Sequence, residues 1–209
     1  MARPSNTAER RAQIAAALIS VMAKKGYDGA SVADVAAHAG LAPGLVHYHF
    51  KNKQEILVSA LRGVVARHEE RLAARVAAAG PHPARRLEAF VDFHLGLGAD
   101  ADPEALACWI LLSGEALRQP AVRRELRRSL ESFAATLAHI VGDGVDAGAF
   151  RCDDPAAASA ALLATIQGYF LLAATARELI PRGSAAASAK HMAEGLLRPS
   201  KPFENRRRR

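Results

Sequence analysis

The chain has 209 residues, half of them hydrophobic, and carries a net charge of +7 at pH 7. This length allows one large domain or a small domain joined to a larger one, with a substantial core. Apolar residues recur every three or four positions and alanine is frequent, which favours packed helices and excludes a sheet. The polar N-terminus is not a secretory signal, and the distant Cys108 and Cys152 indicate a reducing compartment. We therefore expect a cytoplasmic all-α protein.

The positive charge is concentrated in the N-terminal part of the chain. Residues 1–80 contain 11 Lys or Arg and 6 Asp or Glu, a balance of +5, whereas residues 81–209 contribute only +2. A basic region beside a nearly neutral one indicates a polyanion as the partner of the basic region. On charge alone, a soluble surface that is basic without such a partner explains the pattern equally well.

The first helix is expected to begin at a cap on Asn6 or Thr7 and to end at Gly26. A second helix follows at once. Ser31 and Asp34 stand three residues apart at its start, which is the spacing of a capping box with aspartate in place of glutamate.

A short third helix should follow the second after a tight turn. Gly40 can adopt the left-handed conformation that ends the second helix, Pro43 begins the third, and Phe50 closes it. Two helices joined in this way, and packed through Val35 and Val46, form a helix-turn-helix motif. In such a motif the second helix lies in the DNA major groove and presents its first residues to base edges.

The predicted DNA-binding residues lie at helix N-termini, in the third helix and just after it. Histidine and tyrosine can bond phosphates or bases, lysine supplies charge, and small residues let the backbone approach closely. The set comprises Ser31, Pro43, Gly44, Leu45, His47, Tyr48, His49, Lys51 and Lys53. Three earlier cations, Arg3, Arg10 and Arg11, could reach phosphates or form a solvated arm, and both interpretations stay open.

Asn52 should cap a long fourth helix, with Glu55 at the reciprocal position. At 1.5 Å per residue a helix reaching Gly80 would be roughly 40 Å long, enough to leave one domain and enter the next. Prolines then mark further helices at about 84–97, 104–118, 121–147 and 155–178. A last helix spans about 185–197, which makes about nine in all. We expect a DNA-binding domain at 1–52, a connecting helix at 53–80, a ligand-binding and dimerisation domain at 81–198, and a disordered basic tail at 199–209.

The stretch "SVADVAAHAGLAPGLVHYHFKNKQEIL" resembles the signature of the tetracycline-repressor (TetR) family of bacterial transcription regulators. The matching positions are Ala39, Gly40, Gly44, Phe50, Lys53 and Leu57. The resemblance implies an all-helical homodimer that binds a palindromic operator and releases it when a small molecule enters the C-terminal domain. Two positions depart from the pattern: Ala42 stands where the family commonly has serine, and His47 where it commonly has a phosphate-binding tyrosine. Whether His47 or Tyr48 makes that contact is left open.

Residues 84–198 contain no catalytic constellation, no metal-ligand spacing and no phosphate loop, so we expect no cofactor. They offer polar and aromatic groups on apolar helices, which is how a small-molecule pocket looks, although core aromatics explain each residue singly. The candidate ligand-binding residues are Phe90, Phe93, His94, Trp109, Leu112, Glu115, Phe133 and Gln167. Trp109 near Glu115 would suit a cationic ligand. The region around them, with "GAFR" after it, resembles choline-responsive (BetI-type) members of the family.

The segment from Pro155 to Ala176 has no charged residue and is long enough to span a bilayer. Its many alanines, its Gln167 and the lack of flanking basic clusters favour a buried helix over a membrane span. Because it is apolar all round, we expect it to be covered on all sides. Pairing of this helix and the last one with their two-fold copies would supply a dimer interface.

The predicted function is that of a ligand-responsive, homodimeric transcriptional regulator, a repressor that leaves its double-stranded DNA operator when a small-molecule effector binds. It is not expected to be an enzyme or to bind a membrane. The alternatives are a helical interaction module without DNA binding, and a small enzyme with His94 and Glu115 as acid and base.

Overall fold

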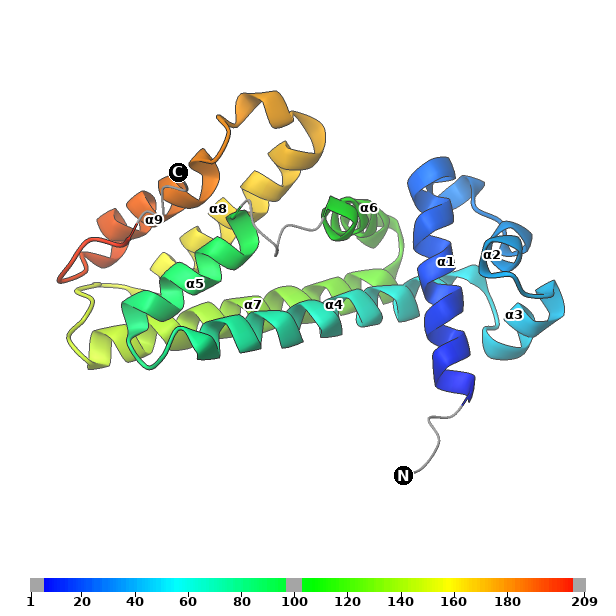
Figure 1. Cartoon of the computed structure of the whole chain (residues 1–209), viewed down its shortest axis with the longest axis horizontal. Helices are drawn as coiled ribbons and strands as arrows, with labels where there is room; N and C mark the ends of the chain where they lie inside the picture. The colour runs from blue at the N-terminus through cyan, green and yellow to red at the C-terminus, as the bar shows by residue number, and fades with distance from the viewer. Residues whose placement is uncertain (1–5, 97–102, 205–209) are drawn as a thin grey trace. The chain divides into compact units, whose positions relative to one another are not determined.

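The computed structural model describes residues 6–96 and 103–204. Within these ranges it contains no strand, which confirms the all-α expectation. Nine α-helices and one short 3₁₀ helix (Arg177–Leu179) follow one another in the described residues (Figure 1). The α-helices are α1 (Asn6–Gly29), α2 (Val32–Ala39), α3 (Pro43–His49), α4 (Lys53–Ala78), α5 (Pro83–Leu95), α6 (Pro103–Arg118), α7 (Pro120–Asp146), α8 (Pro155–Thr175) and α9 (Ser184–Leu197).

Glycine and proline set most of the helix limits, as expected. Gly26, with φ of 70°, interrupts α1, and the helix resumes for one further turn to Gly29. Five of the helices after α1 begin on a proline. At the first helical position an amide hydrogen would have no partner within the helix, so proline loses no hydrogen bond there. Helix α8 ends at Thr175, earlier than the expected 178, and the 3₁₀ helix follows it.

The chain forms two compact units. Unit 1 comprises residues 1–68 and 107–129, and unit 2 comprises residues 69–106 and 130–209. Helices α4 and α7 therefore each contribute to both units. Residues 107–129 belong to the same unit as the N-terminal helices, although the sequence placed them in the C-terminal domain at 81–198.

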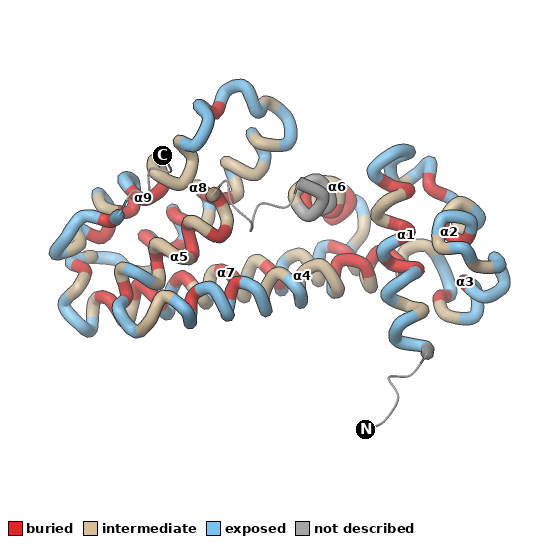
Figure 2. The backbone as a smooth tube through the Cα atoms, viewed as in Figure 1, coloured by how far each residue is buried: buried red, intermediate tan, exposed pale blue. Residues whose placement is uncertain are grey.

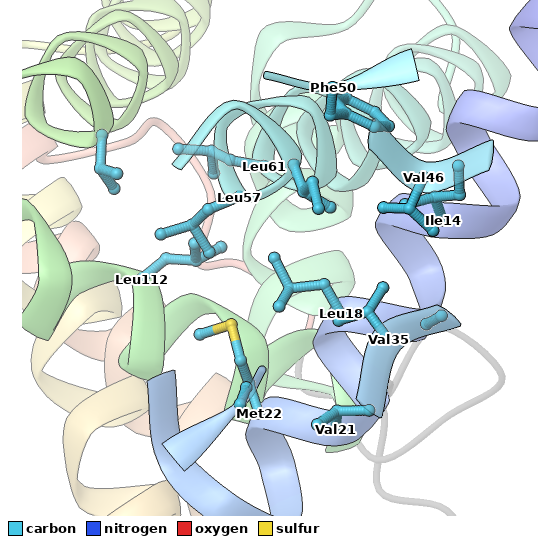
Figure 3. Close-up of a cluster of buried hydrophobic side chains, with 14 of the residues drawn as sticks. Ile14, Leu18, Val21, Met22, Val35, Val46, Phe50, Leu57, Leu61 and Leu112 are labelled. Carbon is cyan, nitrogen blue, oxygen red and sulfur yellow. The ribbon is translucent and has the colours of Figure 1, made fainter. Parts of the chain in front are cut away.

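The core of unit 1 holds the three N-terminal helices together. Ile14 and Leu18 of α1, Val35 of α2 and Val46 of α3 have no exposed surface. Figure 3 shows these side chains pointing toward one another, with Leu57 and Leu61 of α4 and Leu112 of α6 completing the cluster. Burial of this many apolar side chains makes the position of α3 a consequence of core packing.

Unit 2 packs α5, α8 and α9 against one another. The chain beyond α9 docks on the same unit. The Phe203 side chain is buried with its ring centroid 6.2 Å from that of Phe150, and its amide donates to Glu194 Oε1 at 2.8 Å. The expectation of a disordered tail was therefore wrong for residues 199–204, because one aromatic residue anchors them. Arg3 and Arg206–Arg209 lie outside the described residues.

Helix α8 is covered on one side only within a single chain. Its buried residues are Ala158, Ser159, Leu162 and Ile166, while Leu171 is half exposed. Figure 2 shows that much of α8 is intermediate or exposed. Helices α5 and α9 pack against one face of α8, so coverage on all sides, which was expected from pairing with a second copy, stays a prediction. By length and composition alone α8 could also cross a membrane.

Candidate nucleic-acid interface and ligand site

The turn between α2 and α3 has the geometry that its glycine predicted. Gly40 has φ of 66° and ψ of 32°, a left-handed conformation. Its amide donates to the Ala37 carbonyl at 3.2 Å, and the Leu41 amide donates to the Ala36 carbonyl at 2.9 Å. This 6→1 bond is that of a Schellman motif, so the carbonyls of Ala36 and Ala37 are satisfied by the backbone.

Helix α3 separates an anchoring face from an exposed one. Val46 and Phe50 are 0% and 2% exposed, whereas Tyr48 is 79% exposed and His47 and Leu45 also face solvent. The Ala42 cap makes no side-chain hydrogen bond, as its departure from the family pattern suggested, and Pro43 takes the first helical position. The exposed face is thus free for a partner, while the buried face holds the helix in place.

Pro43, Gly44 and Lys51 are exposed at the two ends of α3, and His49 is half-buried. The His49 ring lies edge-on to Tyr48, with ring centroids 5.1 Å apart. Seven of the nine predicted DNA-binding residues therefore lie together on α3 and its flanks.

The other two predicted residues use their polar atoms within unit 1. The Lys53 ammonium donates to the carbonyls of Tyr27 (2.6 Å) and Ala30 (2.8 Å) and lies 4.2 Å from the centre of the Tyr27 ring. It therefore closes the C-terminal end of α1. Asn52 caps α4 through the Glu55 amide, but the Glu55 carboxylate returns to the amide of Lys51 and not to Asn52.

Ser31 forms the predicted capping box. Its hydroxyl accepts from the Asp34 amide at 3.0 Å, and the Asp34 carboxylate accepts from the Ser31 amide at 3.0 Å. Lys25 donates to the same carboxylate at 2.6 Å. The Lys25 ammonium first, and then the Ser31 hydroxyl and amide, hold the pKa of the Asp34 carboxyl well below its ordinary value.

Four of the candidate ligand-binding residues form an aromatic cluster in unit 2. The His94 ring centroid lies 4.4 Å from that of Phe90, 5.3 Å from Phe93 and 5.7 Å from Phe133, and His94 Nδ1 donates to the Phe90 carbonyl at 2.8 Å. Phe170 of α8 lies 6.1 Å from the same ring. Sequence reasoning took only Gln167 of this helix as a ligand-binding candidate, assigned the rest to dimerisation, and so missed Phe170. Its spacing of three from Gln167 is the signal that could have found it.

Of the remaining four candidates, Gln167 lies on α8 in unit 2, whereas Trp109, Leu112 and Glu115 belong to unit 1. Leu112 is part of the unit 1 core. The Glu115 carboxylate accepts from Gln119 Nε2 at 2.7 Å, and Gln119 Oε1 accepts from Gln54 at 3.1 Å. The ligand set expected from the sequence is thus divided between the two units.

Glu115 also influences a neighbouring tyrosine. Burial raises the pKa of the Tyr27 phenol, and the charge of Glu115 adds to this, while a hydrogen bond with Gln119 acts in the opposite direction. This buried polar network lies among α1, α4 and α6 of unit 1, so Glu115 has a structural role there.

Unit 2 also has an open pocket of about 590 Å³, within the range of small-molecule sites. Helices α4 and α7 supply most of its wall, and Phe133 joins it to the aromatic cluster around His94. The lining residues are Glu69, Leu72, Ala73, Val76, Ala77, Gly80, Pro81, Arg86, Ser132, Phe133 and Thr136. No group of three or more potential metal ligands occurs in the part of the chain that the structure describes.

Comparison with known proteins decides the family. The family described as "Bacterial regulatory proteins, tetR family" matches residues 14–60, and that described as "BetI-type transcriptional repressor, C-terminal" matches residues 83–198, more than half of the chain. The chain belongs to the TetR family. Members of this family are DNA-binding transcriptional regulators and not enzymes.

Individual relatives agree with this TetR assignment. The chain is 30% identical over 119 residues to the HTH-type transcriptional regulator BetI of Rhizobium meliloti, and the match covers 56% of this chain and 57% of that protein. The first relatives are thus matched over less than two thirds of their length. A transcriptional regulator from Rhodococcus is 28% identical with a TM-score of 0.74, over 89% of this chain and 95% of that one. A regulator from Saccharomonospora viridis in complex with choline shares the TetR fold, with 24% identity and a TM-score of 0.75, over 90% of this chain and 95% of that one.

Proposed function

We propose that this TetR-family protein is a homodimeric repressor that binds a palindromic DNA operator through α3 and leaves it when a small molecule binds in unit 2. The observation that carries the proposal is the division of α3 into two faces. Val46 and Phe50 are buried in unit 1, whereas Leu45, His47 and Tyr48 are exposed. Side chains that face solvent on an anchored helix can reach base edges and phosphates.

Footprinting on the DNA that flanks the protein's own gene tests this proposal. The full chain is expected to protect a palindrome with half-sites about 34 Å apart, one helical turn or a multiple of it. The double variant His47→Ala with Tyr48→Ala should lose the protection while keeping its helical circular dichroism signal, because both side chains are exposed. Full protection by the double variant would contradict the role of α3, and no protected site with the wild type would favour the interaction module. The two single variants then separate His47 from Tyr48 as the phosphate contact.

The proposed dimer forms through α8 and α9. Both helices leave large apolar side chains exposed in the single chain: Leu171, Leu172, Met192 and Leu196. Pairing of α8 and α9 with their two-fold copies would cover these apolar side chains. A dimer therefore explains the uncharged face of α8 without a membrane. Two operator half-sites also require two copies of α3 held at a constant spacing.

Light scattering of the full chain in solution tests the dimer. The wild type is expected to have twice the mass of one chain, and Leu171→Lys with Leu172→Lys should give the mass of one. Leu117→Lys is the control, because Leu117 is 78% exposed but lies on α6, outside the proposed interface. A wild type with the mass of one chain would contradict the proposal.

The proposed effector site comprises the aromatic cluster around His94 and the pocket that Phe133 joins to it. Effector binding can displace DNA only if the effector has a higher affinity for the form that does not bind DNA. Helix α4 contributes to both units and is therefore the proposed mechanical link. Choline is the first probe, because the C-terminal region matches the BetI type and aromatic rings attract small cations.

Thermal unfolding with choline chloride, against sodium chloride at equal ionic strength, tests this effector class. Choline is expected to raise the unfolding midpoint as binding stabilises the folded state, and to release the footprinted DNA. The variant Phe133→Ala should abolish both effects. No shift with choline would exclude it, and mass spectrometry of small molecules that co-purify with the protein would then identify the effector.

A further inference from the structure

Arg11 lies on the buried side of α1. It precedes Ile14 by three residues and Leu18 by seven, and both of these side chains are completely buried. Residues at this spacing share one face of a helix. The Arg11 side chain is therefore directed toward α2 and α3, although its charge suggested a contact with DNA.

The end of α3 is where the Arg11 guanidinium binds. Arg11 Nη1 donates a hydrogen bond to the carbonyl oxygen of His49, and the guanidinium carbon lies 4.0 Å from the centre of the Phe50 ring. His49 is the last residue of α3, so its carbonyl has no partner within the helix. A charged hydrogen bond and a stacked ring together restrict this helix end more than either alone.

A second residue of α1 binds the other helix of the motif in the same way. Gln13 Nε2 donates at 2.8 Å to the carbonyl of Ala39, the last residue of α2. Helix α1 thus reaches the C-terminal ends of both α2 and α3. Two such contacts from one rigid helix limit how far α3 can rotate relative to α2.

We propose that Arg11 is a positioning residue for DNA recognition, which sets the orientation of α3 through His49 and Phe50 and does not itself bind a phosphate. The inference rests on the proposed function, because it requires α3 to be the helix that reads DNA. Hydrogen bonds to base edges form only when α3 has the right orientation in the groove, whereas contacts to phosphates survive a small displacement of the helix. Loss of Arg11 should therefore reduce discrimination between sequences more than it reduces binding to DNA in general.

The test compares Arg11→Met with Lys24→Met in the full chain. Both variants lose one positive charge from α1 and keep an unbranched side chain of good helix propensity. Lys24 is exposed and provides the matched control. The probes are the footprinted duplex and a scrambled duplex of equal length and composition. Fluorescence anisotropy at several salt concentrations measures the affinity of each protein for each duplex.

For Arg11→Met we expect the affinity for the footprinted duplex to fall about tenfold, as for the loss of a hydrogen bond from a charged group. Its affinity for the scrambled duplex and the slope of log affinity against log salt should stay at the wild-type values. Lys24→Met should keep the wild-type ratio of the two affinities. Arg11→Lys retains a donor of similar reach and should recover part of the preference for the footprinted duplex.

Four results would overturn the inference while leaving the proposed function intact. Equal weakening on both duplexes, with a salt slope reduced by about 1, would show a phosphate contact by Arg11. Loss of helical circular dichroism in Arg11→Met would show that Arg11 is needed for folding. Unchanged discrimination, or an Arg11→Lys variant no better than Arg11→Met, would show that the bond to His49 does not matter. Failure of the wild type to select any duplex would instead overturn the proposed function, and the inference with it.

Discussion

The ammonium of Lys190 lies 2.8 Å from the carboxylate of Asp92 in the interior of unit 2, where the lysine side chain is only 3% exposed. It also donates to the carbonyl of Glu204 at 3.1 Å. The pair joins α9 to α5, and Glu204 brings the docked C-terminal residues to the same point. A buried charge is tolerated only when it is paired.

Substitution of Asp92 and substitution of Lys190 should therefore lower the free energy of unfolding by unequal amounts. Asp92→Asn leaves the buried ammonium without its counter-charge and is expected to lower the free energy of unfolding by about 3 kcal/mol or more. Lys190→Met removes the buried charge itself and leaves the partly exposed Asp92 near water, so it should cost less than half as much. Urea unfolding followed by circular dichroism measures both. Equal losses would contradict burial of the lysine.

Gly144 of α7 should not tolerate a side chain. A Cβ atom at this position would lie 2.0 Å from Cδ2 of Phe150, a buried ring that itself contacts Phe203. Gly144→Ala is expected to destabilise the protein by about 1–3 kcal/mol through overpacking. Gly142→Ala on the same helix meets nothing within 4 Å and should stabilise it by about 0.5–1 kcal/mol. Thermal unfolding of the pair distinguishes the packing effect from helix propensity, and a stabilised Gly144→Ala would contradict the packing.

The helix limits and the two faces of α3 could be predicted from the sequence because local rules determine them. A glycine in the left-handed conformation, such as Gly40, ends a helix without help from distant residues. Helical spacing alone places Val46 and Phe50 on the face opposite Tyr48. The capping box of Ser31 and Asp34 is equally local, since both partners lie within one turn.

Contacts between distant residues could not be predicted in this way. Lys53 binds carbonyls 23 and 26 residues earlier in the chain, and nothing in its local pattern distinguishes it from a lysine that faces a phosphate. Leu112 and Ala116 form part of an apolar stripe on α6, with Glu115 beside it, but the stripe does not reveal that unit 1 covers it. A single aromatic residue in a polar tail, Phe203, gave too weak a signal to predict docking.

The Asp34 carboxyl should make folding sensitive to acid. Its pKa in the folded state lies well below the ordinary value of 3.8 because Lys25 and Ser31 bind the charged form. As the pH falls below about 4, the carboxyl of the unfolded chain takes up a proton while the folded one does not, so stability is lost progressively. In the variant Asp34→Asn this loss should be absent. Thermal midpoints from pH 6 to pH 2 are expected to converge for wild type and variant as the pH falls, and parallel curves would contradict the assignment.

Gly44 should matter for DNA binding and not for folding. It is the second residue of α3, it is exposed, and a Cβ atom there would meet nothing within 4 Å. Gly44→Ala should therefore raise the free energy of unfolding by up to about 1 kcal/mol, as alanine favours a helix. The same methyl group would stand between the start of α3 and the DNA, so the affinity for the footprinted duplex should fall.

Gly40→Ala is the matched comparison for Gly44→Ala. Gly40 has a positive φ of 66°, which a residue with a Cβ atom adopts at a cost of roughly 1–2 kcal/mol. This variant should lose stability, and its affinity for the footprinted duplex should fall because the turn that orients α3 is distorted. Opposite signs of the stability change in the two variants, with selective loss of operator affinity in Gly44→Ala, would locate the DNA at the start of α3. Wild-type operator affinity in Gly44→Ala would place the DNA elsewhere on the protein.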